Sequence, residues 1–505
     1  MSEIDIPLAY GSSPARSRLA GDARLINGFA ERVGSGKTDV AVYGVSGLTE
    51  WVDIGEICRG ILPFGDGSLL VVAGSQVVSI SNSAVVTTYS GIVPGRDRCI
   101  LAKNANIDRQ AMLVCDAGLF AISGNTVTFI NKPDLFNATI RSVDWVDGYF
   151  IIALSDGRFF ISGINDTTVD ALDFATAEAD PDGMVRAFVN GRELLLFGGN
   201  SIEVWHNLGI AAFPFQRADA KLTTGLGARH SVARVNQQVI FVDTTGIVQR
   251  LAGGYTAQRV SNVGLEKEIQ QLGDFSGLFA FTYSDKGHDY YVLSSDSWTW
   301  VLDLSTSEWH ERRTGFSSRW QANHCQWFAG KFIVGSRDVP KLFYIDDTVF
   351  AESGDPLIFT MRLPVVDAFP GGASVSRLNL DCETGVGDAG QFVARALTWD
   401  MINIMWDSDA ITMDQTHDIH ADLPDVAGLY PEYDPEIMLR WSDDGGRSWS
   451  QGTRAKLGKQ SEVRRVKFDR LGAFKRQGRI FEISVSASVF RAILSAKIIA
   501  EPRAL

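Results

Sequence analysis

A pattern of four short strands that recurs along the chain constrains its fold more than any other feature. The pattern is clearest in residues 185–217, where turns containing glycine or asparagine separate VRAFVN, ELLLFG, IEVWHN and AAFPFQR. Short runs rich in Val, Ile, Leu, Phe and Trp between such turns are typical of β-hairpins. A single four-stranded meander has two apolar faces and cannot bury both by itself, so it needs copies on either side.

Copies of this unit extend over more than half of the sequence. The turn of the first hairpin can be identified in seven units, and successive turns lie about 40 to 50 residues apart. The seven turn positions are Gly67, Asp108, Gly148, Gly191, Gln237, Gly287 and Gly330. A four-stranded unit that repeats at this period is the signature of a β-propeller blade. We therefore predict about seven blades in residues 58–350, with residues 264–275 as a helix between two of them.

Closing such a ring usually takes a strand from the other end of the domain, because an unpaired edge strand is prone to associate with other chains. The segment TDVAVYG, residues 38–44, is predicted to supply this strand beside residues 342–350. The rest of residues 1–57 begins with several Pro, Gly and Ser residues and is predicted to form an irregular, extended arm.

After about residue 350 the repeat is lost and a different β pattern begins. Five strand-like segments predict a separate antiparallel sheet or sandwich in residues 351–505, interrupted by a strand-poor acidic insertion at about 386–435. The segments are residues 357–366, 373–385, 436–450, 464–472 and 479–501. The predicted fold class is therefore all-β, with an about seven-bladed β-propeller followed by a C-terminal antiparallel β-sandwich-like domain.

Composition narrows the class of function. The net charge of −13 argues against a protein that coats DNA, which requires a basic surface. No run of 18 apolar residues predicts a membrane-spanning helix, and the N-terminus lacks the pattern of a secretory signal. The five cysteines are scattered and form no C-x-x-C pair, which is typical of reduced thiols in a protein made in a cytoplasm. No membrane insertion is therefore expected.

Two groups of residues that resemble chemical sites are interpreted as structural or exposed residues. His417 and His420 lie among acidic residues that include Asp414, but two histidines in an acidic loop are more often surface residues than metal ligands. Glu203 and His206 lie on one predicted strand, where alternation places Glu203 with Trp205 on one face and His206 on the other. We predict no metal, no cofactor and no catalytic residues.

Charge is segregated in the C-terminal part of the chain. Residues 381–436 hold thirteen acidic side chains against one arginine, whereas residues 454–479 hold ten Lys and Arg against two acidic residues. Three interpretations are open: two solvated faces of one domain, complementary faces that meet between neighbouring copies, or contact of the basic stretch with nucleic acid. The candidate inter-subunit or DNA-channel charges are Arg464, Arg465, Arg470, Arg476, Asp407, Asp409 and Asp414.

One local motif is specific. Residues 442–449, SDDGGRSW, match the Asp-box S-x-D-x-G-x-x-W of sialidases and related β proteins. The motif residues Ser442, Asp444, Gly446 and Trp449 are predicted to stabilise a hairpin turn, because a carboxylate accepts hydrogen bonds from turn N–H groups and glycine permits unusual backbone angles. A sialidase would carry several such boxes, an arginine triad and an acid–nucleophile set, so we predict a structural role.

Several longer phrases resemble the packaged-DNA stabilisation proteins of short-tailed bacteriophages, the tail accessory factors that form a tail nozzle or hub. The phrases are residues 174–185, 194–209, 213–220, 288–313 and 439–450, and their order along the chain is more specific than any one of them. The resemblance runs over nearly the whole chain and is weakest in the acidic insertion.

The resemblance implies a structural virion protein of the tail, assembled in the cytoplasm of the bacterial host, with no catalytic residues. It implies a homohexameric ring below the portal and its adaptor protein, through which packaged DNA passes. Such a ring extends the DNA channel, helps to retain the genome and docks tailspike, fibre or needle proteins. The alternative is a carbohydrate-binding or sialidase-like propeller protein without ring formation.

Overall fold

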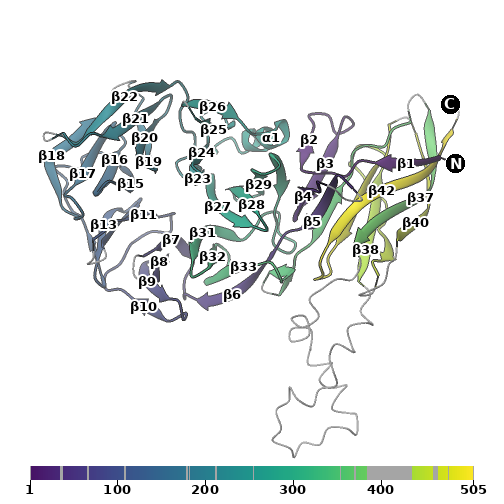
Figure 1. Cartoon of the computed structure of the whole chain (residues 1–505), viewed down its shortest axis with the longest axis horizontal. Coiled ribbons are helices and arrows are strands. Elements are labelled where there is room, and N and C mark those ends of the chain that lie inside the picture. The colour runs from purple at the N-terminus through teal and green to yellow at the C-terminus, as the bar shows by residue number, and fades with distance from the viewer. Residues whose placement is uncertain are drawn as a thin grey trace, which may run out of the picture. The chain divides into compact units, whose positions relative to one another are not determined.

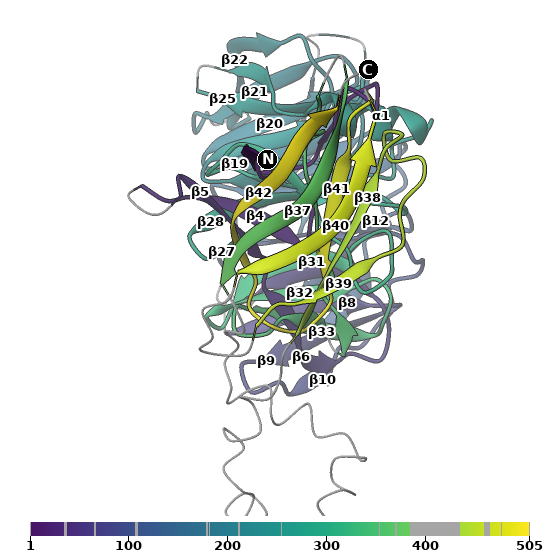
Figure 2. The same cartoon turned by 90° about the vertical axis from the view of Figure 1, so that its right-hand side faces the viewer.

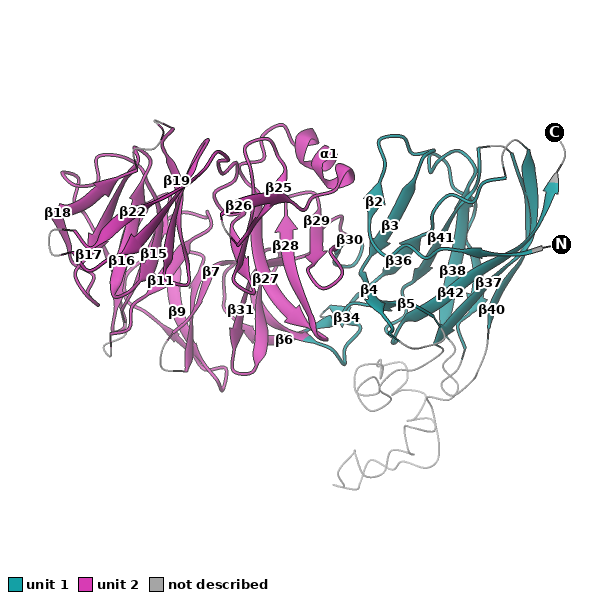
Figure 3. Ribbon diagram, turned by 45° about the horizontal axis from the view of Figure 1, so that its top comes forward, with its two compact units in different colours: residues 1–48, 310–316, 346–505 teal, residues 49–309, 317–345 magenta. Residues whose placement is uncertain are grey.

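The computed structural model describes residues 2–34, 38–64, 67–106, 110–177, 180, 182–210, 213–253, 255–352, 354–368, 371–383, 435–458, 465–475 and 477–503. Within these residues the chain forms 42 strands and one helix (Figures 1 and 2). It divides into two compact units, coloured separately in Figure 3. Unit 1 comprises residues 1–48, 310–316 and 346–505, and unit 2 comprises residues 49–309 and 317–345.

Seven blades of four strands each form a β-propeller, which takes up unit 2 and includes residues 47–48 and 310–311 of unit 1 (Figure 1). Five blades are separate four-stranded sheets, and the sixth and seventh are four-stranded parts of larger sheets. The first three blades are β7 (Cys58–Pro63), β8 (Ser68–Ala73), β9 (Gln76–Ser81) and β10 (Val86–Thr88); β11 (Ile100–Lys103), β12 (Gln110–Cys115), β13 (Gly118–Ser123) and β14 (Thr126–Phe129); and β15 (Ile140–Val146), β16 (Tyr149–Leu154), β17 (Arg158–Ser162) and β18 (Val169–Thr176). The fourth and fifth are β19 (Met184–Asn190), β20 (Glu193–Gly198), β21 (Ile202–Asn207) and β22 (Phe215–Leu222), and β23 (Ala233–Val235), β24 (Gln238–Val242), β25 (Val248–Ala252) and β26 (Thr256–Arg259). The last two are β27 (Phe279–Asp285), β28 (His288–Ser294), β29 (Thr299–Asp303) and β30 (Glu308–Glu311), and β31 (Ala322–Phe328), β32 (Lys331–Ser336), β33 (Lys341–Asp346) and β6 (Gly47–Asp53). The predicted fold of about seven blades followed by a further β domain is confirmed.

The second strand of each blade explains the apolar runs in the sequence. In β16, Ile151 and Ala153 pack with residues of β20 in the next blade, whereas Ile152 and Leu154 pack with residues of β12 in the preceding blade. Both faces of the strand are therefore buried, and the sequence reads YFIIAL without polar alternation. In the described residues, packing between neighbouring sheets forms a separate apolar cluster at six blade interfaces, which makes the propeller rigid.

The strand that completes the seventh blade is not the predicted one. The fourth strand of that blade is β6 (Gly47–Asp53), next to β33, whereas residues 38–44 contain β5 (Val40–Gly44), which pairs with strands of unit 1. Two contacts fix β6 in place: Glu50 forms an ion pair with Lys341 at 2.9 Å, and the ring of Trp51 lies 5.9 Å from that of Phe328. A strand from the N-terminal part of the chain does complete the ring, as predicted. The prediction that residues 38–44 form this strand is wrong.

The predicted helix lies between the fifth and sixth blades, as expected. It is α1 (Val263–Gln271), and the side chain of Asn262 caps its start by accepting a hydrogen bond from the backbone N–H of Leu265 at 2.9 Å. Leu265 and Ile269 are fully buried and attach the helix to the core of these blades. Among the described residues, no helix is long and apolar enough to cross a membrane.

Unit 1 is a sandwich of two sheets that enclose one apolar core (Figure 2). One sheet has the order β4-β5-β42-β37-β40, with β1 on β42; the other has the order β3-β36-β41-β38-β39, with β2 on β3. The strands are β1 (Ser2–Ile6), β2 (Ser13–Pro14), β3 (Asp22–Ile26), β4 (Gly28–Arg32), β36 (Phe359–Arg362), β37 (Gly372–Glu383), β38 (Glu436–Ser442), β39 (Thr453–Lys456), β40 (Val466–Phe474), β41 (Ile480–Val485) and β42 (Ala492–Arg503), and two short strands, β34 (Ala351–Glu352) and β35 (Asp355–Pro356), lie beside β6.

The N-terminal segment is not the irregular arm that its composition predicts. Residues 2–32 contribute β1 to β4 to the sandwich, and β1 pairs with β42 in a register that joins Ser2 to Ala500. The apolar side chains Ile6, Leu25 and Ala30 lie in the same core as the C-terminal strands. The Pro and Gly residues mark turns between short strands, and distant partners supply the pairing that local composition does not reveal.

Candidate functional site

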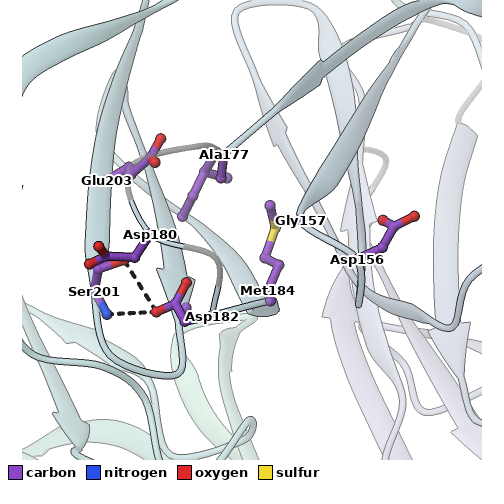
Figure 4. Close-up of a pocket in the computed structure, with 11 residues that line it drawn as sticks. Asp156, Gly157, Ala177, Asp180, Asp182, Met184, Ser201 and Glu203 are labelled. Carbon is purple, nitrogen blue, oxygen red and sulfur yellow. Dashed lines mark hydrogen bonds between the residues drawn. The ribbon is translucent and has the colours of Figure 1, made fainter.

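A cavity of about 320 Å³ lies where the third and fourth blades of the propeller meet (Figure 4). Four carboxylates line it: Asp156, Asp180, Asp182 and Glu203. In Figure 4 the side chain of Met184 lies between Asp182 and Asp156. Clustered carboxylates can serve acid–base chemistry, cation binding or structure, and the hydrogen-bond partners of each one distinguish these roles.

Asp182 holds a turn. One of its carboxylate oxygens accepts hydrogen bonds from the backbone N–H groups of Asn200 and Ser201 at 2.6 and 2.9 Å, which fixes the loop between β20 and β21. Gly198 permits this approach, because a Cβ at that position would lie 2.5 Å from the same carboxylate. The carboxylate is therefore engaged by the neighbouring backbone.

Glu203 is buried and bonded to its own strand. Its carboxylate accepts a hydrogen bond from the indole N–H of Trp205 at 2.8 Å, and only 2% of the residue is exposed. His206 lies directly opposite Glu193 on the adjacent strand, with 3.8 Å between Nε2 and a carboxylate oxygen. The prediction that Glu203 shares a face with Trp205 and not with His206 is confirmed.

The remaining contacts of this cavity are also those of a structural site. Lys221 forms an ion pair with Asp180 at 2.7 Å. In the part of the chain that the structure describes, no group of three His, Cys, Asp or Glu side chains is arranged to hold a metal ion, and all five cysteines are buried as free thiols. His417 and His420 lie outside the described residues. The contacts of these carboxylates therefore indicate a structural site that holds the fourth blade and the segment leading into it.

The Asp-box residues form a closed turn after β38. The hydroxyl of Ser442 donates to Asp444 at 2.7 Å and accepts from the N–H of Gly446 at 2.8 Å. Asp444 also accepts from the backbone N–H groups of residues 447 and 448, both at 2.9 Å, and Gly446 has a φ of +82°. The Trp449 ring lies beside this turn, with the guanidinium groups of two arginines over it at 4.8 and 4.9 Å.

A buried arginine fastens the same turn to the sandwich. Arg479 is 2% exposed, and its Nε and Nη2 donate to the two carboxylate oxygens of Asp443 at 2.6 and 2.8 Å. Its Nη1 donates to the carbonyl oxygen of Leu471 at 2.6 Å, and Nη2 also reaches that of Ala473 at 3.1 Å. The fork of one guanidinium thus joins the Asp-box turn to the C-terminal half of β40.

The pKa of Asp444 leads to a testable prediction. Hydrogen bonds from the Ser448 hydroxyl and backbone N–H and from Ser442 hold the pKa of Asp444 well below its usual range. A carboxyl with a lowered folded-state pKa stabilises the fold above its unfolded pKa of about 3.9, and the stabilisation is lost as pH falls through the folded value. The stability difference between the native protein and Asp444→Asn should therefore be largest near neutral pH and shrink below about pH 4.

Thermal unfolding of both proteins between pH 7 and pH 3 checks this expectation. A difference in melting temperature that stays constant over the whole range would contradict it. The comparison uses an amide of the same shape, so the change in packing at the turn is small.

Few of the predicted charge sites lie in the described part of the chain. Arg465 immediately precedes β40 and is exposed, and Arg470 lies within β40, exposed, at a φ of +62°. On the same strand Asp469 forms an ion pair with Arg377 of β37 at 2.5 Å. The other predicted charges lie outside the described residues; they are Arg464, Arg476, Asp407, Asp409 and Asp414.

Sequence reasoning missed the role of Arg479. Its partners, Asp443 and the carbonyls of residues 471 and 473, lie between 6 and 36 positions away along the chain. The one signal available was an arginine directly before the apolar strand IFEISV, and such a residue also suits an exposed strand end. The three aromatic rings of Trp441, Phe474 and Phe481 that surround the guanidinium become visible only after folding.

Comparison with protein families gives one match. A family model described as Phage_stabilise, Bacteriophage P22 Gp10, beta-propeller, matches residues 4–350. These residues include all seven blades, the strands β2 to β5 and the last three residues of β1. The search of the curated proteins found no match.

Comparison with solved structures finds propeller-sized matches of low identity. The WD40 beta propeller domain of Doa1 is 11% identical with a TM-score of 0.38, over 60% of this chain and 96% of that one. Virginiamycin B lyase from Staphylococcus aureus is 11% identical with a TM-score of 0.43, over 59% and 98%. BamB from Moraxella catarrhalis is 13% identical with a TM-score of 0.37, over 60% and 98%. Likeness of this degree assigns neither a ligand nor a partner.

Proposed function

Because the chain belongs to the Phage_stabilise family of bacteriophage β-propeller proteins, we propose that it is a structural protein of a phage tail that forms a homohexameric nozzle or hub ring. The ring would extend the DNA channel below the portal and its adaptor protein and help to retain packaged DNA. It would also dock tailspike, fibre or needle proteins. The observation that carries this proposal is the family match over residues 4–350, which spans the whole propeller.

The architecture supports a scaffold role. The strands in the middle of the blades are buried on both faces, and carboxylates of the cavity between the third and fourth blades brace a turn and a strand. A rigid propeller presents many loops between its strands, and such loops are suited to docking other proteins. These features suit a rigid scaffold that holds other proteins in position.

Charge also fits a channel that DNA traverses. Each subunit carries a formal charge of −13, so a hexamer would carry 6 × (−13) = −78. A channel wall of the same sign as DNA repels the phosphate backbone and lets DNA slide instead of binding along its length. A basic channel wall in the assembled ring would contradict this part of the proposal.

Native mass spectrometry and electron microscopy of the full-length protein test the ring directly. Six chains of 55.2 kDa predict a particle of 6 × 55.2 = 331 kDa with sixfold symmetry. A protein that stays monomeric both alone and with the portal–adaptor complex would overturn the hexamer. Turnover or binding of glycans by the monomer would instead favour the alternative of a carbohydrate-directed propeller.

Charge reversal in the basic segment before β40 should weaken assembly more than folding. Arg465 is exposed, and β40 is the edge strand of its sheet, a position from which charged side chains can set the register with a neighbouring copy. We expect Arg464→Glu with Arg465→Glu to raise the concentration needed for ring formation by about tenfold or more, with little change in melting temperature. Sedimentation velocity at several protein concentrations measures this effect.

The matched control is Arg192→Glu in the propeller. The Arg192 side chain is 84% exposed and forms a long surface ion pair with Asp147 at 3.3 Å, so its reversal should leave both assembly and folding unchanged. Equal sedimentation of the double mutant and the control would count against a role of the basic segment in assembly.

A further inference from the structure

A row of charged side chains crosses the outer face of one sheet of unit 1. The strand register pairs Arg24 of β3 with Arg362 of β36, Arg362 with Glu482 of β41, and Glu482 with Arg440 of β38. Residues adjacent to these four on the same strands, such as Met361, point into the apolar core. Alternation along a strand therefore places all four charges together on the side away from the core.

Two of the arginines in this row are held by one buried carboxylate. The side chain of Glu482 is 4% exposed. Arg362 donates to one of its oxygens from Nε and Nη2 at 3.0 and 2.7 Å, and Arg440 donates to the other oxygen from Nε at 2.5 Å. Trp449 lies against both guanidinium groups. The carboxylate of Glu482 and the ring of Trp449 therefore fix the orientation of both guanidinium groups.

A second buried carboxylate fixes two more arginines. The side chain of Glu311 is 4% exposed and accepts from Nη1 of Arg24 at 2.9 Å and from Nη2 of Arg313 at 2.8 Å. Asp22, which is 7% exposed, bonds to Arg362 and lies 3.6 Å from Nε of Arg24. All these residues belong to unit 1.

The arginines line a cavity of about 290 Å³ on this face of the sheet. A fifth arginine, Arg18, lines its rim from the loop before β3; it is exposed and forms no ion pair with the described residues. The five arginines carry +5, and the three carboxylates carry −3, so the site holds a net charge of +2. A chain with a net charge of −13 thus concentrates positive charge at one hollow.

We propose that this cavity binds a phosphate group. Arg18 forms no ion pair with the described residues, and the side chains of Arg313 and Arg440 each bond to a single carboxylate, so these three guanidinium groups retain N–H donors. Arginine forks match the oxygens of phosphate. Because the buried carboxylates and Trp449 already order the side chains, binding costs little further loss of side-chain freedom. Asp22 bonds to Arg362 and lies 3.6 Å from Nε of Arg24, so it offsets part of the repulsion between these two arginines across β3 and β36, and an oxyanion in the cavity would offset more of it.

Two sources can supply the phosphate: a free inorganic ion or the backbone of a nucleic acid. Both present the same oxygens to the arginines. The cavity does not require a base or a sugar for the contacts described, so inorganic phosphate is the simplest probe of the site. A short DNA duplex then distinguishes the two sources by competition.

Isothermal titration calorimetry of the full-length protein with inorganic phosphate, at constant ionic strength, tests the site. We expect saturable binding with one site per chain and a dissociation constant in the millimolar range or tighter. Arg18→Ala removes a donor that forms no ion pair with the described residues, so the chain should fold normally and bind phosphate about tenfold more weakly. Arg440→Lys retains the charge but loses the fork, and should also weaken binding.

The control is Arg192→Ala, an exposed arginine of the propeller, which should bind as the native protein does. No saturable heat with the native protein, or equal affinity in the native, Arg18→Ala and Arg440→Lys proteins, would overturn the proposal; the latter result would indicate an adventitious ion only. If DNA competes with phosphate at this site, the natural occupant is a backbone phosphate, and if it does not, the occupant is a free phosphate. Phosphate binding is measured per chain. A protein that does not bind phosphate could therefore still form the hexamer, and a protein that does not form the hexamer could still bind phosphate.

Discussion

Replacing Trp320 by alanine is expected to lower the free energy of unfolding of the propeller by about 3–5 kcal/mol. Trp320 is fully buried, and its ring lies 5.7 Å from that of Phe281 and 5.9 Å from that of Tyr283. Both partners lie on β27 of the sixth blade, whereas Trp320 lies two residues before the start of β31 in the seventh. Its removal leaves a cavity at a blade interface that rigid neighbouring sheets cannot close.

Trp327→Ala is the matched control on the neighbouring strand β31. Trp327 is 56% exposed and stacks only at its edge on Phe332, with ring centroids 4.8 Å apart. Its replacement should cost about 1 kcal/mol or less. Denaturant unfolding followed by hydrogen exchange and mass spectrometry separates peptides of the propeller from those of the sandwich, and equal effects of the two substitutions on propeller peptides would refute the prediction.

Arg479→Ala should destabilise the sandwich by a comparable amount, about 3–5 kcal/mol. The substitution leaves the carbonyl oxygens of Leu471 and Ala473 without their donor, at about 1–3 kcal/mol for each group that stays buried. It also empties the space between three aromatic rings. The Asp-box turn loses its attachment through Asp443, so amide protection should fall first in residues 442–450 and 471–474.

Arg447→Ala tests whether this effect belongs to the buried guanidinium. Arg447 lies in the same turn, is exposed, and contributes its backbone N–H to Asp444. Its side chain can therefore be removed at a cost within about 0.5 kcal/mol. If Arg447→Ala and Arg479→Ala shift the unfolding midpoint of the sandwich equally, the proposed attachment is absent.

The blades could be predicted because their signals are local. The hairpin turns at Gly148, Gly191, Gly287 and Gly330 have φ values of +97°, +67°, +81° and +77°, a region in which glycine is strongly favoured. Apolar runs between such turns repeat with the blade period because each sheet buries both faces. The Asp-box is equally local, since its four residues lie within eight positions of sequence.

Strand partners could not be predicted in the same way. Residues 38–44 look more like a strand in sequence than residues 47–53 do. Ala41 and Val42 are indeed fully buried, but they lie in the sandwich. The choice between β5 and β6 as the last strand of the ring depends on Lys341 and Phe328, which lie almost 300 positions later. Register and partner choice arise from such distant contacts, so local propensity leaves them open.

The arginine-lined cavity illustrates the same limit at the level of a site. Its residues come from four strands and three connecting segments between residues 18 and 482. The sequence shows segregated charge at residues 454–479, whereas the row on the sheet is assembled from single arginines in segments that are otherwise ordinary strands.

The pairing of β1 with β42 also determines when the protein can finish folding. Ser2 pairs with Ala500, so β1 leaves the ribosome almost 500 residues before the strand that satisfies its backbone groups. Blades that use neighbouring segments can form during synthesis, whereas the sandwich cannot. A chain truncated before residue 492 would expose unpaired strand edges and the apolar core of the sandwich. Such a chain would aggregate or be degraded before it could enter an assembly.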